Sequence, residues 1–341
     1  QTNKQTEYMK NKILATLVAF GLVGSASAIE INENLSINGF IDTSWSDLDA
    51  SGNTNDSQRV GLDEIELNFL FNVGNVSGAI HIDDYDHSAG YPENEQIDIE
   101  QAHFTYGLEN GISITIGKYG SKLGFEREDP SGIYTHSRAY ADDITDGTNG
   151  VAGSGFNLGD VDSNVFEGVA ISYNGEVFSL NLSFHNEGDS NLEDNDLDTE
   201  ISFSYTGIEN LAIGGGFLFN NRGNSSSTRE TDVVNIHAAY QTGKLLLAAE
   251  YTEQDIDEGA VFNDKLDGYL FLADYSVSDK LAIALRLSNN EVETSTSDFN
   301  KATIAPRYAI TDSLGAVLEY SDLDYGVEDG NLLAVELTYT F

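Results

Sequence analysis

Carboxylates are the most abundant ionisable groups in this 341-residue chain. The sequence holds 57 Asp and Glu residues against 16 Lys and Arg residues, so its formal net charge is −41. Such a chain offers no basic surface to neutralise phosphates, and the composition therefore argues against a nucleic-acid binder. Because cysteine is absent, disulfides, cysteine-ligated zinc and thiol catalysis are excluded.

The remaining reactive residue types form no recognisable catalytic group. A hydrolase needs a nucleophile and a base in a defined constellation, and no motif selects such a pair here. The six histidines, at positions 81, 87, 103, 136, 185 and 237, show no paired ligand spacing. His81, His103, His185 and His237 alternate with apolar residues, as the wall residues of a strand do. We therefore expect no enzyme activity, no dedicated metal site and no cofactor.

The acidic segment 187–198 comes nearest to a cation-binding motif. The residues at the spacing of EF-hand ligands are Asp189, Asn191, Glu193, Asn195 and Glu200. However, Asp194 stands where the tight turn of an EF-hand needs glycine. A solvated acidic loop is the favoured interpretation. Weak divalent-cation binding that bridges lipopolysaccharide phosphates is the alternative.

Residues 1–28 have the pattern of a targeting leader. Lys10 and Lys12 precede an apolar run over 13–23, and the small residues of Ala26-Ser27-Ala28 follow. At about 1.5 Å per residue this run covers roughly 17 Å, too little for a ~30 Å hydrocarbon core. We expect a signal peptide that starts near Met9, is cleaved after Ala28 and exports residues 29–341.

The chain from 29 to 341 alternates between apolar and polar or small residues, as in 281–287 and 333–341. A period of two indicates β-strands with one apolar face. Seven short turns rich in Gly, Asn and Asp alternate with eight longer polar loops, which gives sixteen strands. The expected strands are 34–45, 61–72, 75–85, 96–106, 111–117, 165–173, 176–186, 199–206, 209–221, 232–241, 244–255, 266–276, 279–290, 300–310, 313–323 and 331–341. In strand 96–106 the apolar phase changes, so a β-bulge is expected there.

Strict alternation of short turns and long loops is typical of an all-β, antiparallel transmembrane barrel with its turns in the periplasm and its longer loops outside. A soluble protein with an apolar stripe on sixteen strands would need a second layer to cover it. Aromatic residues support the membrane interpretation because they recur near strand ends, as interface girdles do. Those near the turns are Phe71, Tyr106, Tyr173, Tyr205, Tyr240, Tyr275, Tyr308 and Tyr339, and those near the loops are Trp45, Tyr85, Tyr119, Phe184, Phe219, Tyr251 and Tyr320.

If the apolar residues face lipid, the residues between them face the lumen. The acids that this phase places on the pore lining are Asp42, Glu66, Asp83, Glu250, Asp274, Glu319 and Glu336. The bases are Arg286, Lys301 and Arg307. Seven acids against three bases predict a lumen that favours cations.

The sixteen-strand pattern, the long segment after the fifth strand and the ending Leu337-Thr-Tyr339-Thr-Phe341 resemble the general diffusion porins of Gram-negative bacteria. The resemblance implies that segment 118–164 folds into the lumen as a constriction loop. It implies that the barrel-assembly machinery recognises the final strand through Tyr339 and Phe341. It also implies a homotrimer in outer-membrane lipid and lipopolysaccharide.

Charged residues of both signs occupy this constriction segment. They include Lys122, Glu126, Arg127, Glu128, Asp129 and Arg138. The family usually places a basic cluster on the early strands opposite this loop. Here those strands carry Asp42, Glu66 and Asp83 instead, so the arginine cluster of the family cannot be transferred to this chain.

The sequence therefore predicts an outer-membrane porin that lets small hydrophilic solutes and ions diffuse passively, with a preference for cations. Two alternatives remain open. One is a substrate-selective channel, and the other is a barrel with a closed lumen that serves as a surface adhesin or receptor. The eight loops are longer than the turns, but most of them are short and polar for a surface that binds a partner. This favours the channel over the adhesin or receptor.

Overall fold

A computed structural model describes residues 28–50, 57–85, 97–126, 133–140, 165–186, 197–221, 230–257, 263–293, 298–324 and 329–341. The leader to residue 27 therefore lies outside the described residues, as does most of segment 187–198. Within the described part, no helix is long and apolar enough to cross a membrane.

The regular secondary structure of the described residues comprises strands and one 3₁₀ turn, η1 (Glu109–Gly111). The strands are β1 (Ile29–Asn32), β2 (Leu35–Ala50), β3 (Ser57–Val73), β4 (Val76–Tyr85), β5 (Asp98–Gly107), β6 (Ile112–Gly120), β7 (Val165–Asn174), β8 (Phe178–Asn186), β9 (Asp198–Ile208), β10 (Leu211–Asn221), β11 (Glu230–Thr242), β12 (Leu245–Asp257), β13 (Asn263–Ser276), β14 (Leu281–Val292), β15 (Phe299–Ala309), β16 (Leu314–Asp324) and β17 (Asp329–Thr340).

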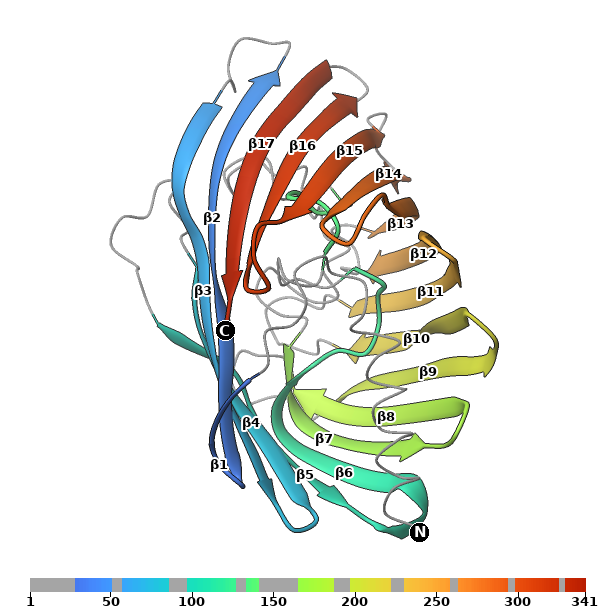
Figure 1. The fold of residues 1–341 in the computed structure, drawn as a ribbon. Coiled ribbons are helices and arrows are strands. Elements are labelled where there is room, and N and C mark those ends of the chain that lie inside the picture. The colour runs from blue at the N-terminus through green and yellow to red at the C-terminus, as the bar shows by residue number, and fades with distance from the viewer. Residues whose placement is uncertain are drawn as a thin grey trace.

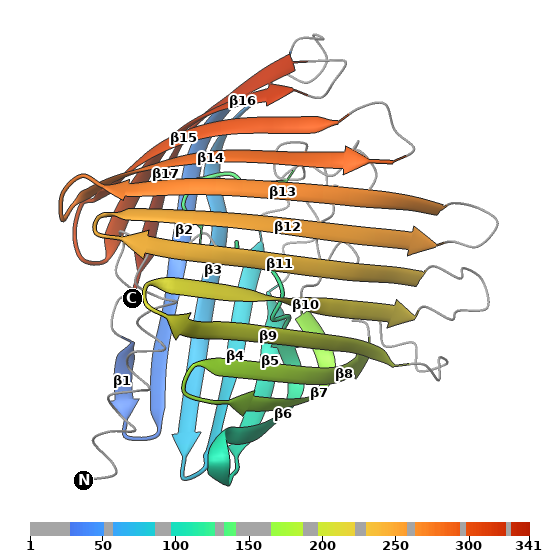
Figure 2. The ribbon, with the colours of Figure 1, turned by 90° about the vertical axis from the view of Figure 1, so that its right-hand side faces the viewer.

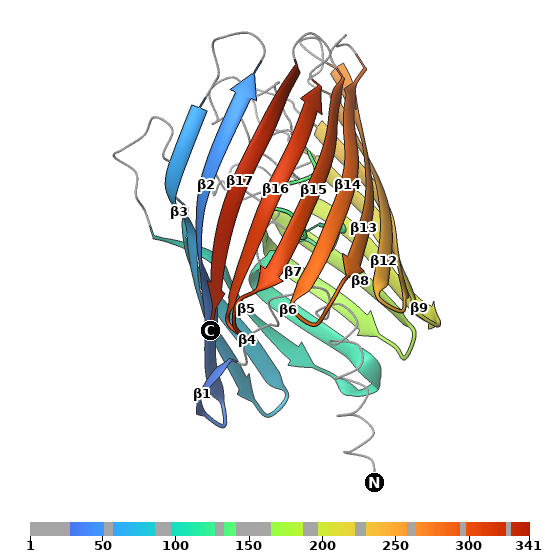
Figure 3. The same ribbon diagram turned by 45° about the horizontal axis from the view of Figure 1, so that its top comes forward.

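Strands β2 to β17 form a closed antiparallel ring of sixteen strands, as the sequence predicts. Each strand pairs with the next in the chain, and β17 pairs with β2 over Phe40–Ala50. Gly39 and Phe341 then exchange two backbone hydrogen bonds of 3.1 Å. The red β17 accordingly lies beside the blue β2 (Figures 1 and 3). Within the described strands, closure leaves no strand of the ring without a partner on either side, as a lipid environment requires.

The short strand β1 was not expected. It pairs with Leu35–Ile37 of β2, the part of β2 that extends past the end of β17. Thus β1 continues the hydrogen bonding of the ring where β17 stops. Four residues are too few to show a period of two, which explains why the sequence pattern did not reveal this strand.

Turn lengths differ between the two ends of the barrel as predicted. The seven short turns lie at the end that also holds the C-terminus (Figure 2). Gly74 and Gly243 have φ of +63° and +58° in two of these turns, a conformation that glycine adopts without a steric penalty. With an even number of strands, the chain returns to the side on which it entered.

Side chains alternate in exposure along the strands, so each strand has an interior and an exterior face. In β15 the pattern is almost strictly buried–exposed, and the exposed members include Ile304 and Tyr308. Seven of the eight aromatics expected near the turns are more than a third exposed on the outer surface; Tyr205 is only partly exposed. Among the aromatics expected near the loops, Tyr119 lies on the face of β6 opposite to that of the exposed Ile112 and Ile116. It is therefore buried inside.

The expected β-bulge in the fourth barrel strand is confirmed. His81 pairs with Gln101 and Ile82 pairs with Ile99, so Glu100 is the extra residue of β5. A second register shift in β3 skips Asp63, because Asp42 pairs with Glu64 and Thr43 with Leu62. Each bulge places an additional acidic residue on the ladder without reversing the exterior face on either side.

Candidate functional site

The segment that follows β6 lies inside the barrel. Its described parts, 121–126 and 133–140, contact the inner faces of β9, β11, β12 and β14 to β17, and we call them the docked loop (Figure 1). These contacts join residues more than 75 positions apart in the chain. The inward position that the porin resemblance implies for segment 118–164 agrees with this placement of its described parts.

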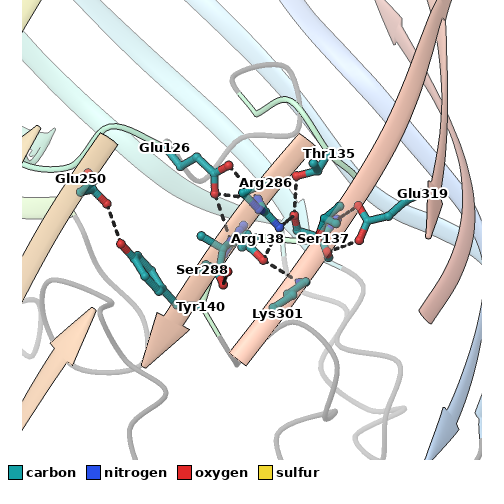
Figure 4. A network of polar contacts seen from close by, with 12 residues as sticks. Glu126, Thr135, Ser137, Arg138, Tyr140, Glu250, Arg286, Ser288, Lys301 and Glu319 are labelled. Atoms are coloured by element: carbon teal, nitrogen blue, oxygen red, sulfur yellow. Dashed lines mark hydrogen bonds and ion pairs between the residues drawn. The ribbon is translucent and has the colours of Figure 1, made fainter. Parts of the chain in front are cut away.

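Arg286 of β14 makes the most extensive contact with the docked loop (Figure 4). Its Nη1 donates to both carboxylate oxygens of Glu126 at 2.7 and 2.9 Å. Its Nη2 donates to the backbone oxygens of Ser137 at 2.7 Å and Arg138 at 2.6 Å. The Arg286 side chain is completely buried. One guanidinium thus joins the two parts of the loop to the wall through charge-assisted hydrogen bonds.

Carboxylates of the wall accept hydrogen bonds from the loop. Glu319 of β16 accepts from the backbone N–H of Ser137 at 3.0 Å and from its hydroxyl, and Glu250 of β12 accepts from the backbone N–H of Phe125 and from Tyr140 at 3.1 Å. Ser288 donates to the backbone oxygen of Ala139. These bonds satisfy backbone groups of the loop that would otherwise be buried without partners.

At the start of the loop, Glu200 of β9 accepts from the hydroxyl of Ser121 at 2.6 Å and from the backbone N–H of Lys122 at 3.0 Å. Glu200 is buried. Its role therefore differs from that suggested by the EF-hand spacing of segment 187–198, because its carboxylate holds the loop from inside the barrel.

The other two basic wall residues are also occupied. Lys301 donates to the backbone oxygen of Arg138 at 2.7 Å. Arg307 donates to Asp274 at 2.6 Å, and its guanidinium lies 4.9 Å from the centre of the Tyr134 ring. All three bases on β14 and β15 are thus directed into the contact between loop and wall.

Apolar side chains also pack between the loop and strands β12 to β15. Tyr134 and Ala139 of the loop pack with inward residues of the wall. Those wall residues are Leu246, Ala248, Leu270, Leu272, Ala284 and Ala305. Burial of this surface stabilises the docked position at roughly 25 cal/mol per Å². Loop and wall are therefore held by both apolar packing and hydrogen bonds.

His136 connects the loop to the last strand. Its Nδ1 donates to Glu336 at 2.7 Å, and Glu319 and Asp63 add negative charge nearby. Burial disfavours the imidazolium, but the hydrogen bond and the charges outweigh it and raise the pKa of His136 to about 9. Burial raises the pKa of Tyr140 as well, so this hydroxyl remains protonated in the same pH range.

The raised pKa of His136 predicts that alkali loosens the loop. A pKa that is higher in the docked state stabilises docking fully below the free value of about 6.5, and this stabilisation disappears as the pH passes about 9. Single-channel conductance in planar bilayers should therefore rise between pH 7 and pH 9.5. In His136→Gln the rise should be absent, and a rise of equal size in both proteins would contradict this role.

The opposite side of the barrel carries acids instead of bases. The inner faces of β2 to β5 hold Asp42, Glu64, Glu66, Asp83 and Glu100, which we call the acidic wall. Strands β2, β4 and β5 contain no Lys or Arg, and β3 contains only Arg59, which lies 3.4 Å from Asp63. Thr338 of β17 donates to Asp42 at 2.9 Å. The basic wall residues thus lie together with acidic partners near the docked loop, whereas the strands of the acidic wall carry few bases of their own.

All ten residues that the sequence phase places on the pore lining are on the inner face and buried. Asp274, Glu250, Glu319, Glu336, Arg286, Lys301 and Arg307 bond to the loop or to each other, whereas Asp42, Glu66 and Asp83 belong to the acidic wall. In the loop, Glu126 and Arg138 contact Arg286, and the backbone of Lys122 contacts Glu200. Arg127, Glu128 and Asp129 lie outside the described residues.

Sequence reasoning missed Glu64, Glu100 and Glu200. Glu64 shares the buried face of Glu66, so the alternation in β3 could have identified it. Glu100 is the extra residue of the β5 bulge, where the alternation is interrupted, and only the expected bulge offered a signal. Glu200 alternates regularly with Asp198 and Ser202 on the buried face of β9, so the phase of that strand could have identified it. At the C-terminus, the rings of Tyr339 and Phe341 lie 6.1 Å apart.

No protein-family model matches the sequence, and no curated protein matches it. Solved structures do match. An anion-selective porin from Comamonas acidovorans has 12% identity and a TM-score of 0.67, with 90% of this chain and 99% of that chain covered. OmpF of Salmonella typhi has 14% identity and a TM-score of 0.64, with 92% and 100% covered.

The outer-membrane channel DcaP of Acinetobacter baumannii has 13% identity and a TM-score of 0.62, with 93% of this chain and 100% of that chain covered. At such identities the likeness concerns the fold, and the side chains of the interior must be interpreted from this chain alone. The closed ring, the turn asymmetry and these matches together show that the chain has the fold of the porin-type outer-membrane barrels.

Proposed function

We propose that the protein is a passive diffusion channel for small hydrophilic solutes and ions in the outer membrane of a Gram-negative bacterium. The observation that carries the proposal is the docked loop, which is held to one side of the barrel by Arg286, Glu319 and Glu250. A sixteen-stranded barrel is wide enough for an aqueous channel. A loop bound along one wall narrows such a channel and sets the largest solute that passes.

The charges on either side of the passage support a preference for cations. The bases Arg286, Lys301 and Arg307 are directed into contacts with the loop or with Asp274. The acidic wall has no such set of bases on its own strands. Negative potential in a narrow passage with low-dielectric walls raises the local cation concentration. The selectivity thus depends on the acidic wall more than on the total charge.

This proposal predicts the sign of the zero-current potential. In a tenfold KCl gradient across a planar bilayer, the potential should have the sign of potassium permeation. Glu66→Gln combined with Asp83→Asn should move the potential towards zero, because both residues belong to the acidic wall. Glu30→Gln with Glu33→Gln removes the same charge near β1, where both side chains are exposed, and should leave the potential unchanged. A potential of chloride sign would contradict the proposed selectivity.

The two other functions predict different currents. A substrate-selective channel would show saturable block by its solute, and an adhesin or receptor with a closed lumen would give no current steps. We infer no catalytic role. As partners we propose outer-membrane lipid and lipopolysaccharide, the barrel-assembly machinery and two further copies of the chain. The fold match to OmpT of Vibrio cholerae in its trimer form supports the homotrimer.

A further inference from the structure

We propose that Glu66, His81 and Glu100 form a binding site for one divalent transition-metal ion, of which Zn²⁺ is the representative. The three residues come from the adjacent strands β3, β4 and β5 and belong to the inner face of the barrel. One potential ligand atom from each lies within 4.8 Å of the others. They form the one such three-ligand group among the described residues.

The separations within this group allow hydrogen bonds and also match the spacing of ligands around a metal ion. Nδ1 of His81 lies 3.2 Å from Oε1 of Glu66 and 3.6 Å from Oε2 of Glu100. Zinc binds nitrogen and carboxylate oxygen at about 2.0–2.2 Å, so two ligands of a tetrahedral ion are about 3.3 Å apart. The two observed distances lie on either side of this value. The two nitrogen–oxygen separations are therefore compatible with an ion bound between His81 and each carboxylate.

Charge also favours a cation at this position. Glu66 is almost completely buried, and neither it nor Glu100 forms an ion pair with Lys or Arg in the described parts of the chain. Across the barrel, Glu126 and Asp274 each bind an arginine. The His81 imidazole is the partner of both carboxylates, and it can carry at most one positive charge. A divalent ion would compensate the two negative charges together.

The β-bulge provides the third ligand. Because Glu100 is the extra residue of β5, it reaches the side of the sheet that already holds His81 and Gln101. The side-chain amide of Gln101 lies 3.4 Å from the second carboxylate oxygen of Glu100. A regular ladder would direct Glu100 away from His81, so the bulge is what completes the group.

The ligand types indicate the class of metal. An imidazole with two carboxylates favours zinc, iron, nickel or copper, whereas calcium and magnesium prefer oxygen ligands alone. A fourth tetrahedral position would be filled by water. Binding displaces the proton on Nδ1 of His81. On the acidic wall, an ion held here would also remove negative charge from the passage.

The test is zinc titration of the folded full-length barrel, without an affinity tag, in detergent by isothermal calorimetry. We expect one Zn²⁺ per chain, with no competition from a hundredfold excess of Mg²⁺. His81→Gln and Glu100→Gln should each weaken binding about tenfold or more. His136→Gln is the matched control, because His136 also contacts a carboxylate but belongs to no three-ligand group among the described residues, and its affinity should equal that of the wild type.

The absence of zinc binding by the folded wild-type barrel would overturn the proposal, as would unchanged affinity in His81→Gln and Glu100→Gln. Heat-dependent migration on denaturing gels establishes that each variant is folded before titration. The site belongs to the wall of the proposed channel, but calorimetry does not require conduction. A barrel that binds zinc and carries no current would therefore refute the proposed channel function and leave the proposed zinc site intact.

Discussion

Arg286→Ala is expected to raise the single-channel conductance of the barrel several-fold and to leave the barrel folded. The substitution removes four hydrogen bonds to the docked loop and leaves the carboxylate of Glu126 without its buried partner. Loss of one member of a buried ion pair costs about 3–5 kcal/mol. The ring itself is closed by backbone bonds between β2 and β17 that do not involve this side chain. The cost should therefore appear as release of the loop.

The control for this variant is Arg59→Ala, which removes the same charge from a side chain that is 41% exposed and pairs with Asp63 on its own strand. The conductance of Arg59→Ala should stay close to the wild-type value. Conductance in Arg286→Ala equal to that of the wild type, in protein that retains its heat-dependent migration, would show that the loop does not limit the passage.

Removal of residues 331–341 is expected to abolish assembly of the barrel. These residues supply most of β17, which pairs with β16 on one side and β2 on the other. Without them two long sheet edges would face lipid, where each unsatisfied backbone group costs several kcal/mol. The truncated chain should be absent from outer-membrane fractions and should show no heat-dependent migration.

Deletion of Ile29–Asn32 gives a matched comparison, because it removes a strand that pairs only with the start of β2. This variant should still assemble, since the ring of sixteen strands remains complete. If the chain truncated before 331 also assembled into a heat-modifiable species, β17 would not be required for closure.

The strand arrangement was predictable because its physical cause is local. In β15 and β17 the side chains alternate between lipid and interior, so a period of two is present in the residues themselves. The difference in length between turns and loops then distinguished the two ends of the barrel. The prediction was weakest at β1 and at the skipped residues Asp63 and Glu100, where the alternation is too short or is interrupted.

The contacts of the interior were not predictable in the same way. The phase of each strand placed Glu319 and Arg286 inside, but it could not indicate that both bind the loop. That outcome depends on where a segment 160 positions away in sequence folds, as for Glu126 and Arg286. Of the seven acids predicted to line the pore, four bind the loop or Arg307. The other three, Asp42, Glu66 and Asp83, belong to the acidic wall, so the acidic charge on the passage lies more to one side than the sequence suggests.

The central claim is that an aqueous passage, narrowed by the docked loop, runs through the barrel. The most direct measurement is the swelling of proteoliposomes in a series of uncharged sugars of increasing size. For the wild-type barrel we predict rapid swelling in the smallest sugars and a steep fall with solute size, with the cutoff moved to larger sugars in Arg286→Ala. Liposomes that hold folded barrel and swell no faster than protein-free liposomes would contradict the account.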